Sequence, residues 1–102
     1  MPHLLHLDSS ADLVASRSRA ITAEFAAAWT ARGPEFTVTH RDLHTDPLPH
    51  LVDSELHWPA AVRREGANPP AAAQELMDTI HAELLAADVV VVGAPLYNYT
   101  VP

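Results

Sequence analysis

Four consecutive valines, Val89–Val92, constrain the fold more than any other feature of the sequence. The run follows Asp88 and ends at Gly93, so it is short and apolar on both faces. A strand of this kind lies in the middle of a parallel sheet, with helices above and below it. The run therefore predicts an α/β protein.

Two further strands are predicted upstream of the valines. His3–Leu7 is a short apolar run that ends abruptly at Asp8, and Phe36–His40 alternates and contains β-branched residues. After the second strand, Pro47 and Pro49 impose an extended loop. These patterns place the three strands at the start, the middle and the end of the chain.

Two helices separate the predicted strands. The first extends from about Ser16 to Arg32, before Gly33 and Pro34 stop it, and the second begins near 68–70. Apolar residues at helical spacing predict their buried faces, which are Ala20, Ile21, Phe25, Ala28 and Trp29 in the first and Ala73, Leu76, Met77, Ile80 and Leu84 in the second. A short helix is also predicted within Ser54–Arg64.

The alternation of strands and helices allows two orders of the parallel strands, 1-2-3 or 2-1-3. In either order Val89–Val92 lies at an edge, where unpaired apolar strands promote aggregation. We therefore expect that a C-terminal half is missing or is supplied by another chain. The alternative is a dimer that covers this edge.

Composition excludes several classes of function. The 102 residues form one domain at most, and the formal charge of −7 disfavours nucleic acid and anionic membranes as partners. The absence of cysteine excludes disulfides, thiolate zinc sites and thiol catalysis. No apolar run approaches the roughly 20 residues of a membrane span, and the N-terminus lacks the features of a signal peptide. We expect a cytoplasmic protein.

A cluster of serines after the first strand is the first candidate site. Ser9 and Ser10 leave the strand, and Ser16-Arg17-Ser18 begins the helix. The free amides and the positive dipole of a helix N-terminus favour a phosphate group. The glycine pattern of dinucleotide sites is absent, and a serine at this position is also an ordinary helix cap.

The second candidate is the loop that follows the valine strand, 93–99. In the flavodoxin-like order 2-1-3-4-5, ligands bind between the ends of strands 1 and 3. Tyr97 and Tyr99 flank Asn98, and these side chains suit a planar ring with polar edges. The alternative is a loop whose aromatic residues cover the edge of the core.

These residues together resemble a family, the FMN-dependent NADH-azoreductases, which are flavodoxin-like NAD(P)H:quinone oxidoreductases. The resemblance rests on four segments: Leu7-Asp8-Ser9-Ser10, Ser16-Arg17-Ser18, Arg41-Asp42-Leu43 before Pro47-Leu48-Pro49, and Ala94-Pro95-Leu96-Tyr97-Asn98-Tyr99. It covers the whole chain but only about the first half of a family member. It implies a doubly wound parallel sheet in which residues 1–102 supply strands 2-1-3 and lack strands 4 and 5.

The resemblance also implies a cofactor and its ligands. Ser10, Ser16, Arg17 and Ser18 would hold the FMN phosphate, and Leu96, Tyr97, Asn98 and Tyr99 would cradle the isoalloxazine ring. A glycine-rich loop after strand 4, which contacts the ring in family members, has no counterpart here.

The implied reaction is ping-pong transfer of two electrons from NADH or NADPH through flavin to a quinone or azo compound. Because the cofactor carries this chemistry, no residue is predicted as a catalytic acid, base or nucleophile. Family members are homodimers with active sites at the interface.

Three other interpretations compete with this one. The histidines of 40–57 match no zinc pattern, and Asp8-Ser9-Ser10 is not a hydrolase elbow, so neither a metal site nor a hydrolase is predicted. The remaining alternative is a non-catalytic remnant or a partner-binding half-domain.

Overall fold

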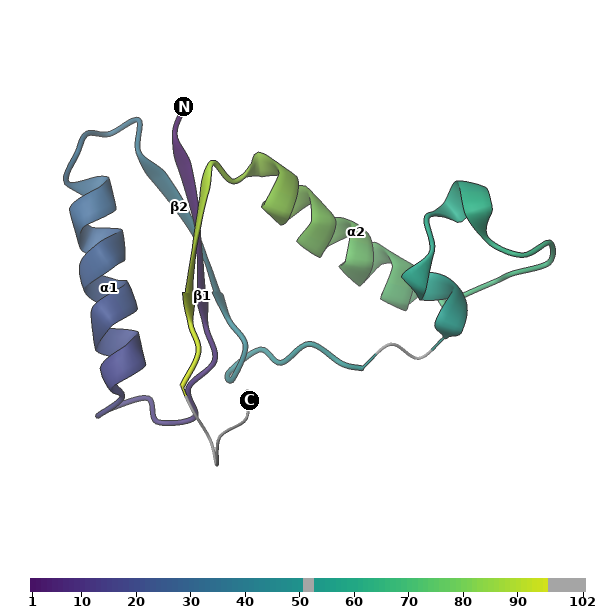
Figure 1. Ribbon diagram of the computed structural model, residues 1–102, viewed down its shortest axis with the longest axis horizontal. Coiled ribbons are helices and arrows are strands. Elements are labelled where there is room, and N and C mark those ends of the chain that lie inside the picture. The colour runs from purple at the N-terminus through teal and green to yellow at the C-terminus, as the bar shows by residue number, and fades with distance from the viewer. Residues whose placement is uncertain (51–52, 96–102) are drawn as a thin grey trace. The chain divides into compact units, whose positions relative to one another are not determined.

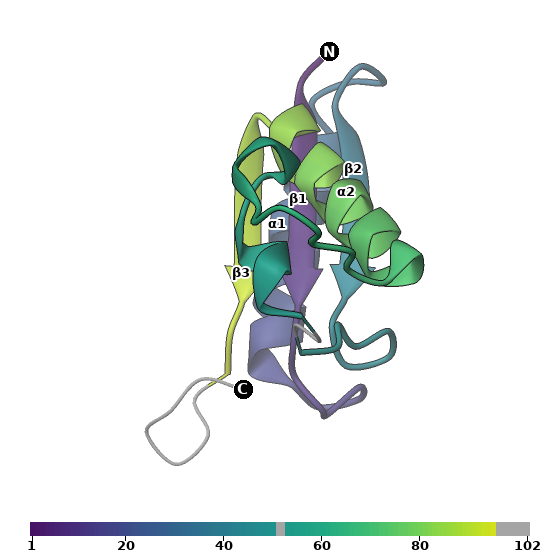
Figure 2. The same ribbon diagram turned by 90° about the vertical axis from the view of Figure 1, so that its right-hand side faces the viewer.

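The computed structural model describes residues 1–50 and 53–95 and contains a three-stranded parallel sheet. The strands are β1 (His3–Asp8), β2 (Thr37–Asp42) and β3 (Val89–Gly93). Their order is β2-β1-β3. The strands overlap nearly edge-on in Figure 1, and Figure 2 shows β1 between its two partners. The predicted order 2-1-3 is confirmed, and β2 begins one residue later and ends two residues later than predicted.

The chain divides into two compact units. The first, the sheet unit, comprises Met1–Pro47 and the chain from Ala86 onward, and the second comprises Leu48–Leu85. Within the part of the chain that the structure describes, no helix is long and apolar enough to cross a membrane.

Helix α1 (Arg17–Thr30) lies against one face of the sheet (Figure 1). Ser16 caps its N-terminus by accepting a hydrogen bond from the backbone N–H of Arg19. Beyond its last turn, Gly33 has a φ of +150°, a conformation that side chains with a Cβ atom rarely adopt. The predicted start and stop signals of this helix are therefore both confirmed.

The buried face of α1 differs from the prediction. Ile21 and Phe25 are exposed, whereas Thr22 and Trp29 are buried. The reason is that the end of the sheet beneath α1 is polar: Thr22 donates a 2.6 Å hydrogen bond to the carboxylate of Asp8. At the other end of the helix, the indole N–H of Trp29 donates to the carbonyl of Thr37. The prediction is therefore confirmed at Trp29 and wrong at Ile21 and Phe25, because apolar periodicity ignores the polar anchor at Asp8.

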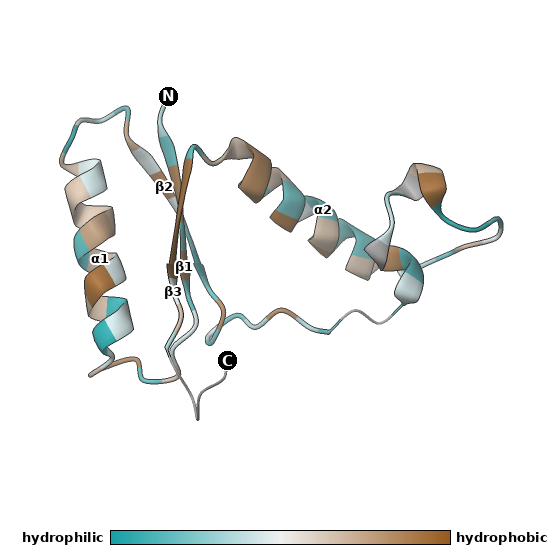
Figure 3. Ribbon diagram, in the orientation of Figure 1, coloured by the Kyte–Doolittle hydropathy of each residue, from teal (hydrophilic) through white to brown (hydrophobic). Residues whose placement is uncertain are grey.

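The core of the sheet unit lies on its central strand. Leu4 and Leu5 are almost completely buried, and they point to opposite faces because side chains alternate along a strand. The valines of β3 are more exposed, and β3 is an edge of the sheet among the described residues. Figure 3 shows β3 as a strongly hydrophobic strand. Both strand orders that the sequence allows place Val89–Val92 at an edge, and this position is confirmed among the described residues. The exposure of the valines follows from it.

The second unit contains two 3-10 turns and a helix: η1 (Ser54–His57), η2 (Ala60–Val62) and α2 (Ala71–Ala86). The two turns replace the single short helix predicted within Ser54–Arg64. Asp53 starts η1 by accepting a hydrogen bond from Glu55 N–H, and proline at position 59 separates the turns.

Helix α2 has no fully buried residue, so its predicted buried face is less buried than expected. Ala73, Leu76, Met77 and Ile80 are half-buried, and Leu84 is exposed. The periodicity therefore identifies the helix correctly and overstates its burial.

Candidate functional site

The carboxyl ends of the three strands meet at one edge of the sheet. In the register, Asp8 at the end of β1 lies between Asp42 of β2 and Gly93 of β3. In open parallel sheets, ligands bind outside the carboxyl ends of the strands. Because α1 also begins at this edge, the end of β1 and the start of α1 form the candidate functional site.

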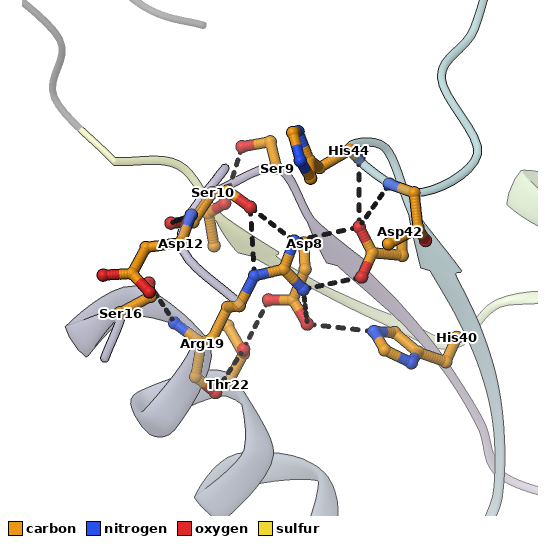
Figure 4. A network of polar contacts seen from close by, with 12 residues as sticks. Asp8, Ser9, Ser10, Asp12, Ser16, Arg19, Thr22, His40, Asp42 and His44 are labelled. Carbon is orange, nitrogen blue, oxygen red and sulfur yellow. Dashed lines mark hydrogen bonds and ion pairs between the residues drawn. The ribbon is translucent and has the colours of Figure 1, made fainter. Parts of the chain in front are cut away.

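Asp8 is the buried centre of a polar network at this edge (Figure 4). One carboxylate oxygen, Oδ1, accepts the hydrogen bond from Thr22 of α1. The other, Oδ2, lies 2.9 Å from Nε2 of His40 on β2. With 3 % of its surface exposed, Asp8 connects the central strand to both α1 and β2. This geometry makes the base of the site rigid.

Arg19 of α1 connects the helix to the loop after β1 and to the end of β2 (Figure 4). Its Nε and Nη2 donate to the carbonyl oxygen of Ser10, where the loop after β1 begins. Its Nη1 and Nη2 donate to the two carboxylate oxygens of Asp42, at 2.6 and 2.9 Å. This paired geometry matches the planar fork of a guanidinium group.

The segment that leads from β1 into the first turn of α1, residues 9–18, is called the serine loop below. Ser10 is buried, and its hydroxyl accepts a hydrogen bond from Asp12 N–H. The hydroxyls of Ser16 and Ser18 lie 3.1 Å apart at the start of α1. The predicted cap role of Ser16 is confirmed, and it is compatible with the phosphate hypothesis because a hydroxyl can accept and donate simultaneously.

The serine loop is tied directly to the end of β3. Ser9 donates two hydrogen bonds to the carbonyl oxygen of Gly93, one from its backbone N–H and one from its hydroxyl at 2.8 Å. The two loops that the sequence analysis selected therefore start side by side. Leu96, Tyr97, Asn98 and Tyr99, the predicted ring-binding residues, lie outside the described residues.

Gly93 is required by close packing. A Cβ atom at this position would lie 2.8 Å from Oδ1 of Asp8 and 3.0 Å from the methyl carbon of Thr22. Such distances are too short for a side chain, so glycine lets β3 approach the Asp8–Thr22 pair.

Among the described residues, His6, Asp8 and His40 form a group whose ligand atoms could hold a metal ion. The two imidazoles are stacked, with ring centroids 4.1 Å apart, and both Nε2 atoms lie 2.9 Å from Oδ2 of Asp8. Stacked rings present their in-plane lone pairs side by side, whereas a metal ion needs them to converge at about 2.0–2.1 Å. We therefore interpret the group as two imidazoles beside one carboxylate, and the absence of a metal site stays a prediction.

Two groups of this network have shifted pKa values. The hydrogen bonds from Arg19, followed by those from the backbone of Thr45 and His44, hold the pKa of Asp42 far below its usual range. Burial lowers the pKa of His6, and the nearby carboxylate of Asp8 opposes that effect. At neutral pH the network therefore contains an ionised Asp42 paired with Arg19 and an uncharged His6.

The structure brings Ser10, Ser16 and Ser18 into one loop and places Arg17 on its exposed side, at the first position of α1. Arg19 and Asp42 were not among the predicted site residues. The sequence does contain a signal for them. Asp8 and Asp42 follow two predicted strands, and Arg19 lies in the first turn of the helix between those strands. Only the register shows that these side chains meet.

The parallel order β2-β1-β3 and the turn from β1 into α1 define a flavodoxin-like protein. The chain belongs to the flavodoxin-like fold family, whose model matches residues 2–102.

Curated relatives are named FMN-dependent NADH:quinone oxidoreductases. The chain is 76 % identical over 102 residues to the protein from Kineococcus radiotolerans, covering all of this chain and 49 % of the relative. It is 42 % identical over 103 residues to the protein from Streptomyces coelicolor and 38 % identical over 109 residues to that from Nostoc punctiforme, covering 47 % and 50 % of them. The chain spans about half the length of the curated relatives it matches.

Proposed function

We propose that this chain carries the flavin-phosphate part of an FMN-dependent oxidoreductase that passes two electrons from NADH or NADPH to quinones or azo compounds. The observation that carries the proposal is the serine loop, which begins beside the end of β3 and ends at the N-terminus of α1. The names of the relatives, which state FMN, NADH and quinone, support the same function.

The residues of the loop suit a phosphate monoester. The N-terminus of a 14-residue helix attracts an anion through its free amides and its dipole. Of the hydroxyls of Ser16 and Ser18, one donates to the other, and the remaining hydroxyl hydrogen can donate to a phosphate oxygen. Arg17 adds a positive charge on the exposed side of the loop. Ser10, Ser16, Arg17 and Ser18 are the proposed phosphate ligands.

FMN would supply the redox chemistry, accepting a hydride equivalent and returning two electrons. The residues of this chain bind and orient it: the serine loop holds the phosphate, and Asp8, Thr22 and Arg19 keep the loop and α1 fixed beneath it. Leu96, Tyr97, Asn98 and Tyr99 are proposed to hold the isoalloxazine ring. The chain is proposed to act in the cytoplasm as part of a homodimer.

Flavin fluorescence titration of the 102-residue chain tests the proposal, with FMN compared with riboflavin, which lacks the phosphate. We expect saturable quenching, with FMN binding at least about tenfold more tightly than riboflavin, because hydrogen bonds to a charged group contribute about 1.5–3 kcal/mol each.

Ser16→Asp and Ser16→Asn form a matched pair of variants. Both residues cap helices as well as serine does, so both variants should keep the fold. The aspartate repels the phosphate, so it should abolish the preference for FMN over riboflavin, while the asparagine retains much of it. An undiminished FMN preference in the aspartate variant would contradict the proposed site, and a folded chain that binds no flavin would contradict the proposal for this chain.

The electron route requires a second experiment. NADH or NADPH is added without oxygen to the FMN-loaded chain, and a quinone or an azo dye follows. Loss of oxidised-flavin absorbance and its return on adding the acceptor are expected. Binding of FMN without either change would limit the function of this chain to cofactor binding.

A further inference from the structure

We propose that Arg19 is a positioning residue for the flavin phosphate, acting through the backbone of Ser10 and the cap of Ser16 rather than by touching the phosphate. This inference rests on the proposed function, and it adds a residue whose role lies beneath the binding surface. It also gives Asp42 a role, which is to orient and neutralise Arg19.

Arg19 fixes both ends of the 10–16 segment. Its side chain donates two hydrogen bonds to the carbonyl oxygen of Ser10, at the start of the segment. Its backbone N–H donates to the hydroxyl of Ser16, at the end of the segment. Figure 4 shows Ser10 and Ser16 on the same side of the network, with Arg19 beside both. One residue therefore sets the distance and orientation between the two serines.

The charge of Arg19 is already paired. The two carboxylate oxygens of Asp42 accept from Nη1 and Nη2, and the arginine side chain is only 14 % exposed. Asp42 is fixed in turn, because its Oδ1 accepts from the backbone N–H groups of His44 and Thr45. Because Asp42 neutralises it, the guanidinium group attracts a bound phosphate only weakly. Arg19 therefore acts on phosphate binding by holding the serine loop in place.

The two acceptors of Arg19 require a planar fork. A guanidinium group can donate to the Ser10 carbonyl and to both oxygens of Asp42 simultaneously, whereas a lysine ammonium is a point charge on a flexible stem. A loop held in its binding conformation loses less conformational entropy when the ligand binds. Loss of the fork should therefore weaken the phosphate contact while the charge is kept.

The test uses the 102-residue chain with Arg19→Met, Arg19→Lys and Asp42→Asn, and Arg32→Met as the control. Arg32 follows the other end of α1, where its guanidinium group lies over the ring of Phe36, far along the helix from the serine loop. Circular dichroism first establishes that each variant is folded. The readouts are amide hydrogen exchange of residues 10–16 without flavin and the ratio of the riboflavin and FMN dissociation constants.

In Arg19→Met and Arg19→Lys, we expect exchange in residues 10–16 to rise at least tenfold. The preference for FMN should fall about tenfold, and riboflavin affinity should stay within about twofold of the original. Asp42→Asn should shift both readouts in the same direction, and Arg32→Met should shift neither. A merely structural role would lower the affinity for both flavins equally.

Two results would overturn the inference. If Arg19→Met keeps the FMN preference, the loop does not depend on Arg19. If Asp42→Asn tightens FMN binding, the guanidinium group contacts the phosphate directly once it is released. Should Arg19→Met not fold, Arg19→Lys and Asp42→Asn provide the same test.

The wild-type chain separates failure of this inference from failure of the proposed function. Equal wild-type affinity for FMN and riboflavin would contradict the proposed function itself, whereas a wild-type preference for FMN that the variants keep would contradict only the role of Arg19.

Discussion

Two arginine–carboxylate pairs, one in each unit, show how the same chemistry serves different purposes. Arg19 and Asp42 are 23 residues apart, and both side chains are largely buried, at 14 % and 18 % exposed. Arg64 and Glu55 are nine residues apart, and the arginine side chain is 79 % exposed. The first pair connects α1, β2 and the serine loop, whereas the second closes a local turn between Glu55 and Arg64.

The difference indicates where the molecule needs fixed geometry. Glu55 is itself buried, and it accepts from both the side chain and the backbone of Arg64, so it organises its own segment. Arg19 instead holds together elements that are distant in sequence, at the edge of the sheet where the candidate site lies. The long-range pair at the end of the strands therefore fixes elements relative to one another, whereas the short-range pair, whose arginine is exposed, organises only its own segment.

The largest expected effect is the difference in stability that results when the arginine of each pair is replaced. Arg19→Met leaves the Asp42 carboxylate without its guanidinium partner and the Ser10 carbonyl without its donors, which should lower the free energy of unfolding by about 2 kcal/mol. Arg64→Met should lower it less, because the Arg64 side chain is largely exposed and water screens its charge. Urea unfolding followed by circular dichroism measures both. Equal losses would remove the distinction between the pairs.

A similar contrast exists between two glycines, one in each unit. Gly93→Ala places a Cβ atom 2.8 Å from Asp8 and should cost about 1–3 kcal/mol through overpacking. Gly66 has a φ of +80° and open space around it, so Gly66→Ala should cost only about 1 kcal/mol through its backbone. Gly66→Asn is the control, since asparagine tolerates positive φ. A larger loss of stability in Gly66→Ala than in Gly93→Ala would mean that close packing does not require a glycine at position 93.

Acid should destabilise the sheet unit in two ranges of pH. Burial lowers the pKa of His6 below 6.5, so the unfolded chain binds this proton more readily and stability falls as the pH drops below about 6.5. The pKa of Asp42 is also lowered, so its contribution is complete above its ordinary value of 3.8 and is lost as the pH falls below it.

The urea midpoint measured between pH 8 and pH 3 tests both ranges. His6→Gln should remove the decline just below pH 6.5, and Arg19→Met should reduce the decline below pH 4. A midpoint that rises between pH 7 and pH 5 would mean that the carboxylate of Asp8 outweighs the burial of His6.

The smallest expected effect concerns the charge of the serine loop. Asp12 accepts hydrogen bonds from the backbone N–H groups of Val14 and Ala15, which lower its pKa and keep it ionised. Asp12→Asn keeps an acceptor for this turn and removes the negative charge, so FMN affinity should rise about twofold at low salt. Riboflavin affinity should not change. A loss of FMN affinity would mean that the carboxylate, rather than the turn, organises the loop.

Local patterns were sufficient to predict the elements that depend on neighbouring residues. The valine strand, the Ser16 cap and the stop at Gly33 each follow from short-range chemistry, and the order 2-1-3 was one of only two allowed. The burial of Trp29 follows from apolar periodicity, whereas the burial of Thr22 could not be predicted because it depends on Asp8, a polar residue of another element. The role of Arg19 required the register that aligns Asp8 with Asp42.

Binding of the flavin phosphate at the serine loop is tested most directly by the backbone amide spectrum of the isotopically labelled chain. FMN is added to one sample and riboflavin to another. We expect the amide signals of residues 9–18 to shift with FMN and to move far less with riboflavin, while the signals of residues 53–85 stay in place. Shifts confined to residues 53–85, or equal shifts of the serine loop with both flavins, would contradict the claim.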